Sequence, residues 1–149
     1  MGLARTRLVL LLDTNALVAL LVHPHRLGSK TRRAIEIAGE AFCSSISLAE
    51  LQIKSLKRKF DIEPVMAKLA VDSGLQVIPF NQADALIVGS QTSLLKHDPF
   101  DRLILATASS NRARLITSDR VMLSLGLSWI QDSFQYARLN LCYLPSKSS

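Results

Sequence analysis

The most constraining feature of the sequence is a nearly continuous apolar segment close to its start that is interrupted by one acid. Residues 8–22 are apolar except for a polar triplet that begins with Asp13. An acid inside such a run is costly in a lipid bilayer, and the run is shorter than the roughly 20 residues that a membrane helix needs. We therefore expect a buried strand at Leu8–Leu12, a polar break and a helix at Asn15–Val22, with no membrane attachment.

Further along the chain, short apolar runs alternate with amphipathic segments. Strands are expected at Ala41–Ser45, Leu75–Phe80, Arg114–Thr117 and Leu127–Ile130, and helices at Ser29–Ala38, Ser47–Lys59, Glu63–Ser73, Gln82–Gly89, Arg102–Ser110 and Arg120–Leu125. This alternation is typical of an α/β domain with a mainly parallel sheet. The 149 residues fit a single domain. Its core is expected at about 8–132, and the tail 145–149 is expected to be disordered.

Composition narrows the class of partner. The chain carries 18 Lys and Arg against 12 Asp and Glu, a net charge of +6. A basic surface favours nucleic acid or an anionic membrane, although a solvated basic face without a partner has the same composition. The two cysteines, Cys43 and Cys142, lack the spacing of a metal knuckle or a redox pair. A bridge between them stays open, but a reduced, cytoplasmic compartment is the simpler interpretation.

Four acids fall at special places in this pattern. Asp13 directly follows the first apolar strand, and Asp119 follows the strand at 115–117 after a single serine. Glu50 lies one turn into the helix after the second strand, and Asp101 lies at the head of a later helix. Ligand sites of open parallel sheets lie at the carboxyl ends of the strands. We therefore expect these four carboxylates to point to the same end of the sheet.

Each of these acids also has a structural explanation. Asp13 and Asp119 could cap the helices that follow them, and Ser47 with Glu50 has the spacing of a capping box. Asp98 and Asp101 flank a proline, as turn and cap residues do. Helix capping, however, would not require the acids to follow apolar strands. Four crowded carboxylates would repel one another, and a hard cation such as Mg²⁺ or Mn²⁺ would relieve that repulsion.

Other chemistries fit the sequence less well. The three histidines lack ligand spacing on a helix; His23 and His25 are expected in a loop, and His97 is either a loop residue or a neighbour of the acids. No glycine-rich phosphate loop and no nucleophilic serine motif is present. A phosphatase of the haloacid-dehalogenase type needs a second Asp two residues after the first, where this chain has Asn15.

Four stretches of the sequence resemble the motifs of PIN domains, and specifically of the VapC-type toxins. They are Leu11-Leu-Asp-Thr-Asn-Ala-Leu17, Ser45-Ile-Ser-Leu-Ala-Glu-Leu51, His97-Asp-Pro-Phe-Asp-Arg-Leu-Ile104 and Leu115-Ile-Thr-Ser-Asp119. Their order and spacing suit the family. The resemblance implies a three-layer α/β/α fold, an Mg²⁺- or Mn²⁺-dependent endoribonuclease with one or two ions, a homodimer, and a cognate antitoxin that covers the site.

The resemblance also assigns roles to individual residues. Asp13, Glu50, Asp101 and Asp119 match the acidic quartet of the family. We expect Asp13 and Asp101 to be the principal ligands, Glu50 to complete the set or orient the attacking water, and Asp119 to bind a second ion. Supporting polar side chains are expected at Thr14, Asn15 and Thr117. Candidates for guiding RNA phosphates are Lys54, Lys57, Arg58, Arg102 and Arg120. An alternative function is a PIN-like module that binds RNA or protein without cleaving.

Overall fold

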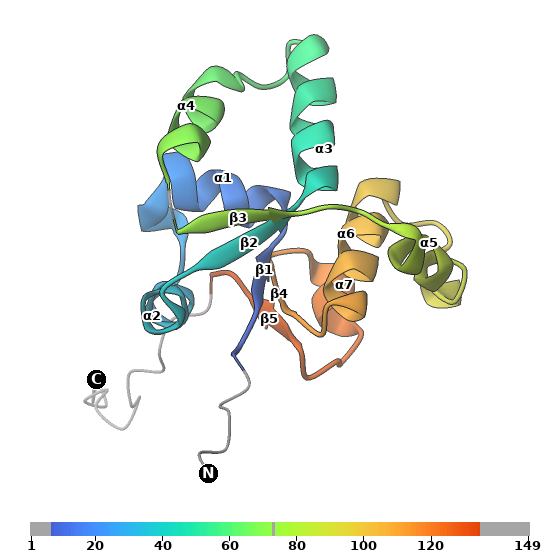
Figure 1. Ribbon diagram of the computed structural model, residues 1–149. Helices are drawn as coiled ribbons and strands as arrows, with labels where there is room; N and C mark the ends of the chain where they lie inside the picture. The colour runs from blue at the N-terminus through green and yellow to red at the C-terminus, as the bar shows by residue number, and fades with distance from the viewer. Residues whose placement is uncertain (1–6, 73, 135–149) are drawn as a thin grey trace, which may run out of the picture.

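The computed structural model describes residues 7–72 and 74–134, in which strands and helices alternate (Figure 1). The strands are β1 (Leu10–Leu12), β2 (Ala41–Ser44), β3 (Leu75–Ile78), β4 (Arg114–Thr117) and β5 (Ile130–Asp132). The helices are α1 (Thr14–Val22), α2 (Ser29–Ala38), α3 (Ser45–Leu56), α4 (Glu63–Val71), α5 (Gln82–Val88), α6 (Pro99–Ser110) and α7 (Arg120–Ser124), with 3-10 turns at Pro24–Arg26 and Thr92–Leu94. Cys142 and the tail 145–149 lie outside the described residues.

The strands form one sheet in the order β3-β2-β1-β4-β5, and every described pair of strands is parallel. The expected α/β/α architecture is therefore confirmed. β1 is the central strand, and all three of its leucines are fully buried because helices cover both faces of the sheet. β3, whose run is followed by Pro79, lies at an edge, where a proline is tolerated.

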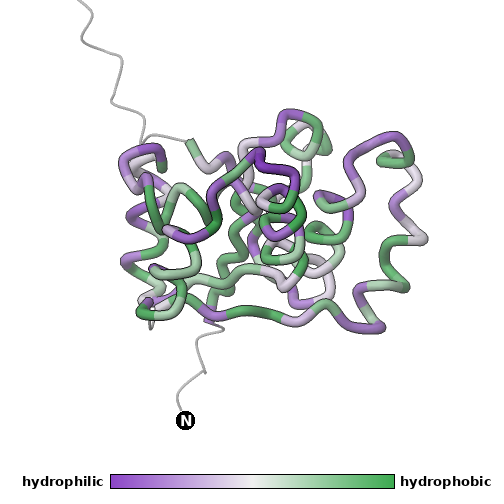
Figure 2. The backbone as a smooth tube through the Cα atoms, turned by 90° about the horizontal axis from the view of Figure 1, so that it is seen from above, coloured by the Kyte–Doolittle hydropathy of each residue, from purple (hydrophilic) through white to green (hydrophobic). Residues whose placement is uncertain are grey.

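The alternation of side chains along β1 divides the core into two layers. Leu10 and Leu12 pack in a cluster with residues of α1, α2, α3 and α4. Leu11 points the other way, into a cluster with residues of α6, α7 and β4. Figure 1 shows these helices on the two sides of the sheet, and in Figure 2 the tube changes between hydrophobic and hydrophilic colours along the helices, as helices with one buried face do.

Two element boundaries differ from the sequence prediction in an informative way. The last strand is Ile130–Asp132 and not Leu127–Ile130, because Gln131 and Asp132 pair with β4 through their backbones. Helix α3 begins at Ser45, two residues earlier than expected, because the Ser44 side chain accepts a hydrogen bond from the Ile46 N–H and caps it. The sequence pattern missed both features, since neither the backbone pairing of polar residues nor a side-chain cap leaves an apolar signal.

Helix α5 is held against α6 by a fully buried acid, Asp84. Its carboxylate accepts hydrogen bonds from the backbone N–H of Asn81 and from the hydroxyls of Thr107 and Ser110. A buried carboxylate is tolerated when its oxygens are bonded in this way. Asp84 is thus explained by the packing of α5, within whose capping box it lies.

Two further sequence expectations concern Cys43 and the membrane. Cys43 is buried in β2 as a free thiol, and burial raises its pKa to about 11, so that it packs as a small apolar side chain. In the part of the chain that the structure describes, none of the helices combines the length and apolar character needed to cross a bilayer.

The central position of β1 makes its leucines critical for stability. Leu11→Ala should lower the free energy of unfolding by about 2–5 kcal/mol, because a buried cavity replaces the side chain. Leu86→Ala is the matched control, since Leu86 on α5 is 74% exposed and its truncation should change stability by less than about 0.5 kcal/mol. Urea unfolding followed by circular dichroism measures both, and equal losses would contradict the two-layer core.

Candidate metal centre

The pairing of β1 with β4 brings the ends of these two strands together. Leu12 lies opposite Ile116, and the backbone N–H of Asp13 extends the ladder by donating to the Ile116 carbonyl at 2.9 Å. The Thr117 hydroxyl donates to Asp13 Oδ2 at 2.6 Å and accepts from the Asp119 N–H at 3.0 Å. Thr117 therefore ties two of the four acids to one point at the carboxyl end of the sheet.

Asp13 is also the N-cap of α1. Its Oδ1 accepts a hydrogen bond from the Ala16 N–H at 2.8 Å, while Oδ2 faces Thr117. Burial raises the pKa of the Asp13 carboxyl, the bonds from Thr117 and Ala16 oppose that rise, and the nearby charge of Glu50 adds to it. Capping and membership of the acidic cluster are thus compatible, because each uses a different oxygen.

Glu50 enters the same place from α3. Its Oε2 accepts from the Thr14 hydroxyl at 2.5 Å, and its Oε1 lies 2.9 Å from Lys54 Nζ. The capping-box interpretation of Ser47 with Glu50 is wrong, because both residues lie inside the helix. The Ser47 hydroxyl is buried 3.1 Å from Thr14 Oγ1 instead. Glu50 is only 7% exposed, so that its orientation is fixed by Thr14 and Lys54.

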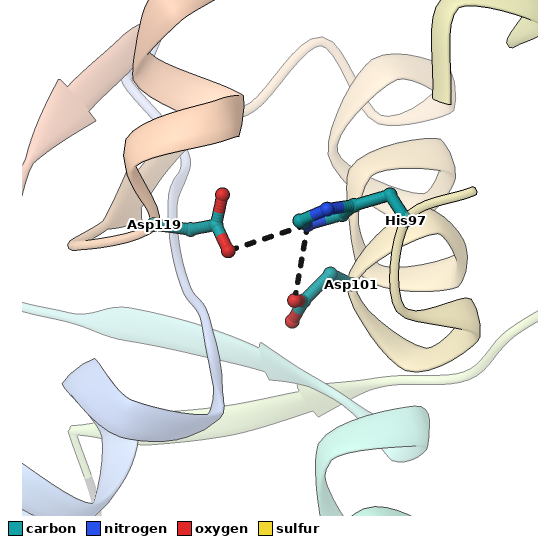
Figure 3. A group of neighbouring side chains, drawn as sticks. All are labelled: His97, Asp101 and Asp119. Atoms are coloured by element: carbon teal, nitrogen blue, oxygen red, sulfur yellow. Dashed lines mark ion pairs between the residues drawn. The ribbon is translucent and has the colours of Figure 1, made fainter. Parts of the chain in front are cut away.

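Asp101 and Asp119 both face Nε2 of His97 (Figure 3). Nε2 of His97 lies 3.3 Å from Asp101 Oδ2 and 3.2 Å from Asp119 Oδ2. Asp101 occupies the first turn of α6, which begins at Pro99 and is capped by Asp98. Asp119 caps α7 through Oδ1, which accepts from the Met122 N–H at 2.9 Å. Of the two alternatives for His97, the structure therefore favours the neighbour of the acids.

The four carboxylates interact electrostatically at Asp101. The pKa of its carboxyl is raised to about 6, first by burial and then by the negative charges of Asp98, Asp119, Glu50 and Asp13. All four sequence-predicted acids are thus near one another at the carboxyl end of the sheet. They arrive there from the end of β1, from α3, from α6 and from the start of α7.

The other sequence-predicted residues are distributed less tightly. Thr14 and Thr117 bind acids directly, whereas Asn15 is exposed and lines a groove beside them. Lys54 pairs with Glu50; Lys57 caps the far end of α3, followed by Arg58 in a left-handed conformation. Arg120 is exposed at the start of α7, and the Nε of Arg102 is buried without a hydrogen-bond partner among the described residues. Only Lys54 of these five cations forms an ion pair with an acid in the described ranges.

The donor atoms present suit a divalent cation. One ligand atom from each of His97, Asp101 and Asp119 lies within 4.8 Å of the others. Nε2 of His97 is buried and makes no well-directed hydrogen bond in the described residues, although both carboxylates are near. Carboxylate oxygens are preferred by Mg²⁺ and Mn²⁺, and imidazole nitrogen is a common ligand of transition metals. The mutual repulsion at Asp101 is what a cation at this place would relieve.

Comparisons with known proteins connect this geometry to a family. The family model described as PIN domain matches residues 10–126. A chain of VapBC2 from Rickettsia felis, solved with a DNA fragment from the promoter, is 24% identical at a TM-score of 0.64, covering 84% of this chain and 98% of that one. A chain of VapBC-1 from nontypeable Haemophilus influenzae is 23% identical at a TM-score of 0.61, covering 86% of this chain and 100% of that one. A chain of DNA-bound VapBC from Salmonella typhimurium is 23% identical at a TM-score of 0.62, covering 84% of this chain and 98% of that one. These similarities show a shared fold. None of the curated proteins matches the chain.

The raised pKa of Asp101 predicts how stability varies with pH. The folded protein holds a proton on Asp101 up to about pH 6, whereas the unfolded chain releases it near 3.8. In EDTA, the free energy of unfolding should therefore fall as pH rises through this window, by on the order of 1–3 kcal/mol. Asp101→Asn should lack this fall, because the amide does not titrate.

The measurement is chemical unfolding of wild type and variant from pH 4 to 7 in EDTA. The diagnostic quantity is the difference between their unfolding free energies as a function of pH, because it cancels the other titrating groups. A difference that does not change across this window would show that neither burial nor the neighbouring acids raise the pKa of Asp101.

Proposed function

Because the chain belongs to the PIN domain family, we propose that it is a divalent-metal-dependent endoribonuclease and the toxin of a toxin–antitoxin pair. PIN domains are generally nucleases and typically use divalent metals. The observation that carries the proposal is the convergence of Asp13, Glu50, Asp101 and Asp119. Burial, and then the charges of Asp98 and of the other three acids, raise the pKa of Asp101. A module that only binds RNA is not favoured, since it has no need to keep four mutually repelling acids.

In this proposal the acids and His97 bind metal or activate water, and their neighbours hold them in place. Asp13 and Asp101 are the principal metal ligands, and Asp119 with His97 holds a second ion. A divalent cation, when bound, makes water more acidic and neutralises charge that develops on the phosphate. Glu50, held by Thr14 and Lys54, orients the attacking water and accepts its proton. Thr117 keeps Asp13 in place.

Positive side chains around the acids would hold the RNA backbone. Lys54, Arg102 and Arg120 adjoin members of the quartet in sequence or in contact, and Lys57 and Arg58 extend the basic region along the end of α3. Such contacts provide affinity without sequence preference. The net charge of +6 is consistent with this arrangement.

The proposed partners are an antitoxin protein and a second copy of the chain. The antitoxin is supported by the fold neighbours, whose structures are of VapBC assemblies, and by a further neighbour described as a toxin–antitoxin complex from Klebsiella pneumoniae. The homodimer rests on the resemblance of the sequence motifs to VapC-type toxins. Mg²⁺ and Mn²⁺ are both proposed, as one or two ions in a cytoplasmic enzyme.

The nuclease proposal predicts that Asp13→Asn and Asp101→Asn each reduce RNA cleavage roughly 100-fold or more, because metal affinity or water activation is lost. Purified protein is incubated with total cellular RNA in Mg²⁺, Mn²⁺ or EDTA. The matched control is Asp61→Asn, an exposed acid whose side chain accepts from the Glu63 N–H, and it should cleave normally. Cleavage that persists in EDTA, or in Asp101→Asn, would refute a metal nuclease.

The toxin proposal is tested by growth. Induced expression of the chain in a bacterium should arrest growth, because unrestrained cleavage of RNA stops translation. Asp101→Asn, expressed to the same level, should allow normal growth. Normal growth with an active wild-type enzyme would indicate RNA processing and not a toxin role.

A further inference from the structure

A groove of about 340 Å³ adjoins the acidic cluster, and the residues that line it have no part in the proposed chemistry apart from Lys54. Asn15 and Ser118 form its boundary with the acids, because they follow Thr14 and Thr117, which bind Glu50 and Asp13. Lys54 lines the groove and also contacts the acidic cluster, since its ammonium pairs with Glu50. The groove therefore begins next to the side chains that hold Asp13 and Glu50, within reach of a chain molecule bound at the acids.

The lining of the groove combines aromatic and cationic side chains. Phe60 and Phe134 supply aromatic rings, and Phe134 is 45% exposed. Arg26 and His23 are exposed and, together with Lys54, supply the polar rim. None of the described lining residues is acidic, so that the groove is suited to an anion that also has a flat apolar face.

We propose that this groove seats an unpaired nucleotide of the RNA next to the phosphate that is cleaved. Its base stacks on Phe134 and Phe60, and its phosphate binds Arg26 and Lys54. Unpaired bases are commonly recognised by stacking on aromatic side chains beside a positively charged track for the backbone. The volume lies within the range of small-molecule sites. The inference rests on the proposed function and adds to it the residues that receive the base next to the cleaved phosphate.

An unpaired nucleotide in this groove can be told apart from a bare phosphate chain by which lining residues it needs. A base in a duplex is stacked on its neighbours and cannot reach Phe134, whereas a base in a loop can be turned outward. The energy of stacking would depend on the base, and the contribution of Arg26 would not. Loss of the ring and loss of the cation should therefore have different signatures.

The test measures binding in EDTA by fluorescence anisotropy, so that it does not depend on cleavage. The probes are a labelled decauridylate and the same decamer with stable abasic residues in place of its nucleotides. Phe134→Ala should raise the Kd for decauridylate at least about fivefold and leave the Kd for the abasic decamer unchanged. Phe134→Trp should retain tight binding. Unchanged binding of the abasic decamer also shows that the variant is folded.

The cation is tested with the same probes at several salt concentrations. Arg26→Ala should weaken both decamers and reduce the slope of log K against log salt by about 0.7. Arg32→Ala is the matched control, because it removes the same charge from an exposed position on α2 outside the groove, and both affinities should be retained.

Two results would overturn the inference. Equal effects of Phe134→Ala on both decamers would exclude a base-stacking role, and unchanged binding of both would leave the groove to a protein partner. Either result can occur with a protein that cleaves RNA in Mn²⁺, in which case the proposed nuclease stands. Absence of metal-dependent cleavage, by contrast, refutes the nuclease even if the groove binds bases.

Discussion

The parallel pairing of β1 with β4 is the interaction on which the rest of the site depends. It places the end of the fully buried leucine strand beside Thr117, whose hydroxyl binds Asp13 and whose oxygen receives the Asp119 N–H. The two flanking helices, α1 and α7, then begin at these two acids. Burial of β1 between two helical layers, together with its pairing to β4, thus fixes Asp13 and Asp119 at the same edge of the sheet.

Two of the carboxylates serve the fold and the site at the same time. Asp13 and Asp119 each use one oxygen to cap a helix, and the other oxygen faces Thr117 or His97. A helix N-terminus carries partial positive charge, which offsets part of the repulsion among the acids. In this fold the same acid can therefore cap a helix and also belong to the acidic cluster. Asn at these positions retains the cap, because it is as good a capping residue as Asp.

The sequence was most informative where apolar periodicity and chain order act together. The runs at β1 and β4, each followed by an acid, were sufficient to predict the sheet edge at which Asp13 and Asp119 meet. Prediction failed at β5, since the buried Gln131 pairs through its backbone. The capping-box alternative for Ser47 with Glu50 also failed, because the hydrogen-bond partner of Glu50 is Thr14, 36 residues away. His97 and the groove at Phe134 depend on the packing of loops, and a local pattern does not record such contacts.

The Thr117–Asp13 hydrogen bond spans 104 residues of sequence, which has a consequence for the time at which the site forms. A ribosome adds about 5–20 residues per second, so that roughly 5–20 s separate the synthesis of the two partners. During that interval β1 lacks one of its two neighbours and Asp13 lacks its anchor. The acids can converge only after nearly all of the described chain has been made. The order of the strands therefore delays assembly of the acidic cluster on a nascent chain until β4 and Asp119 have been made.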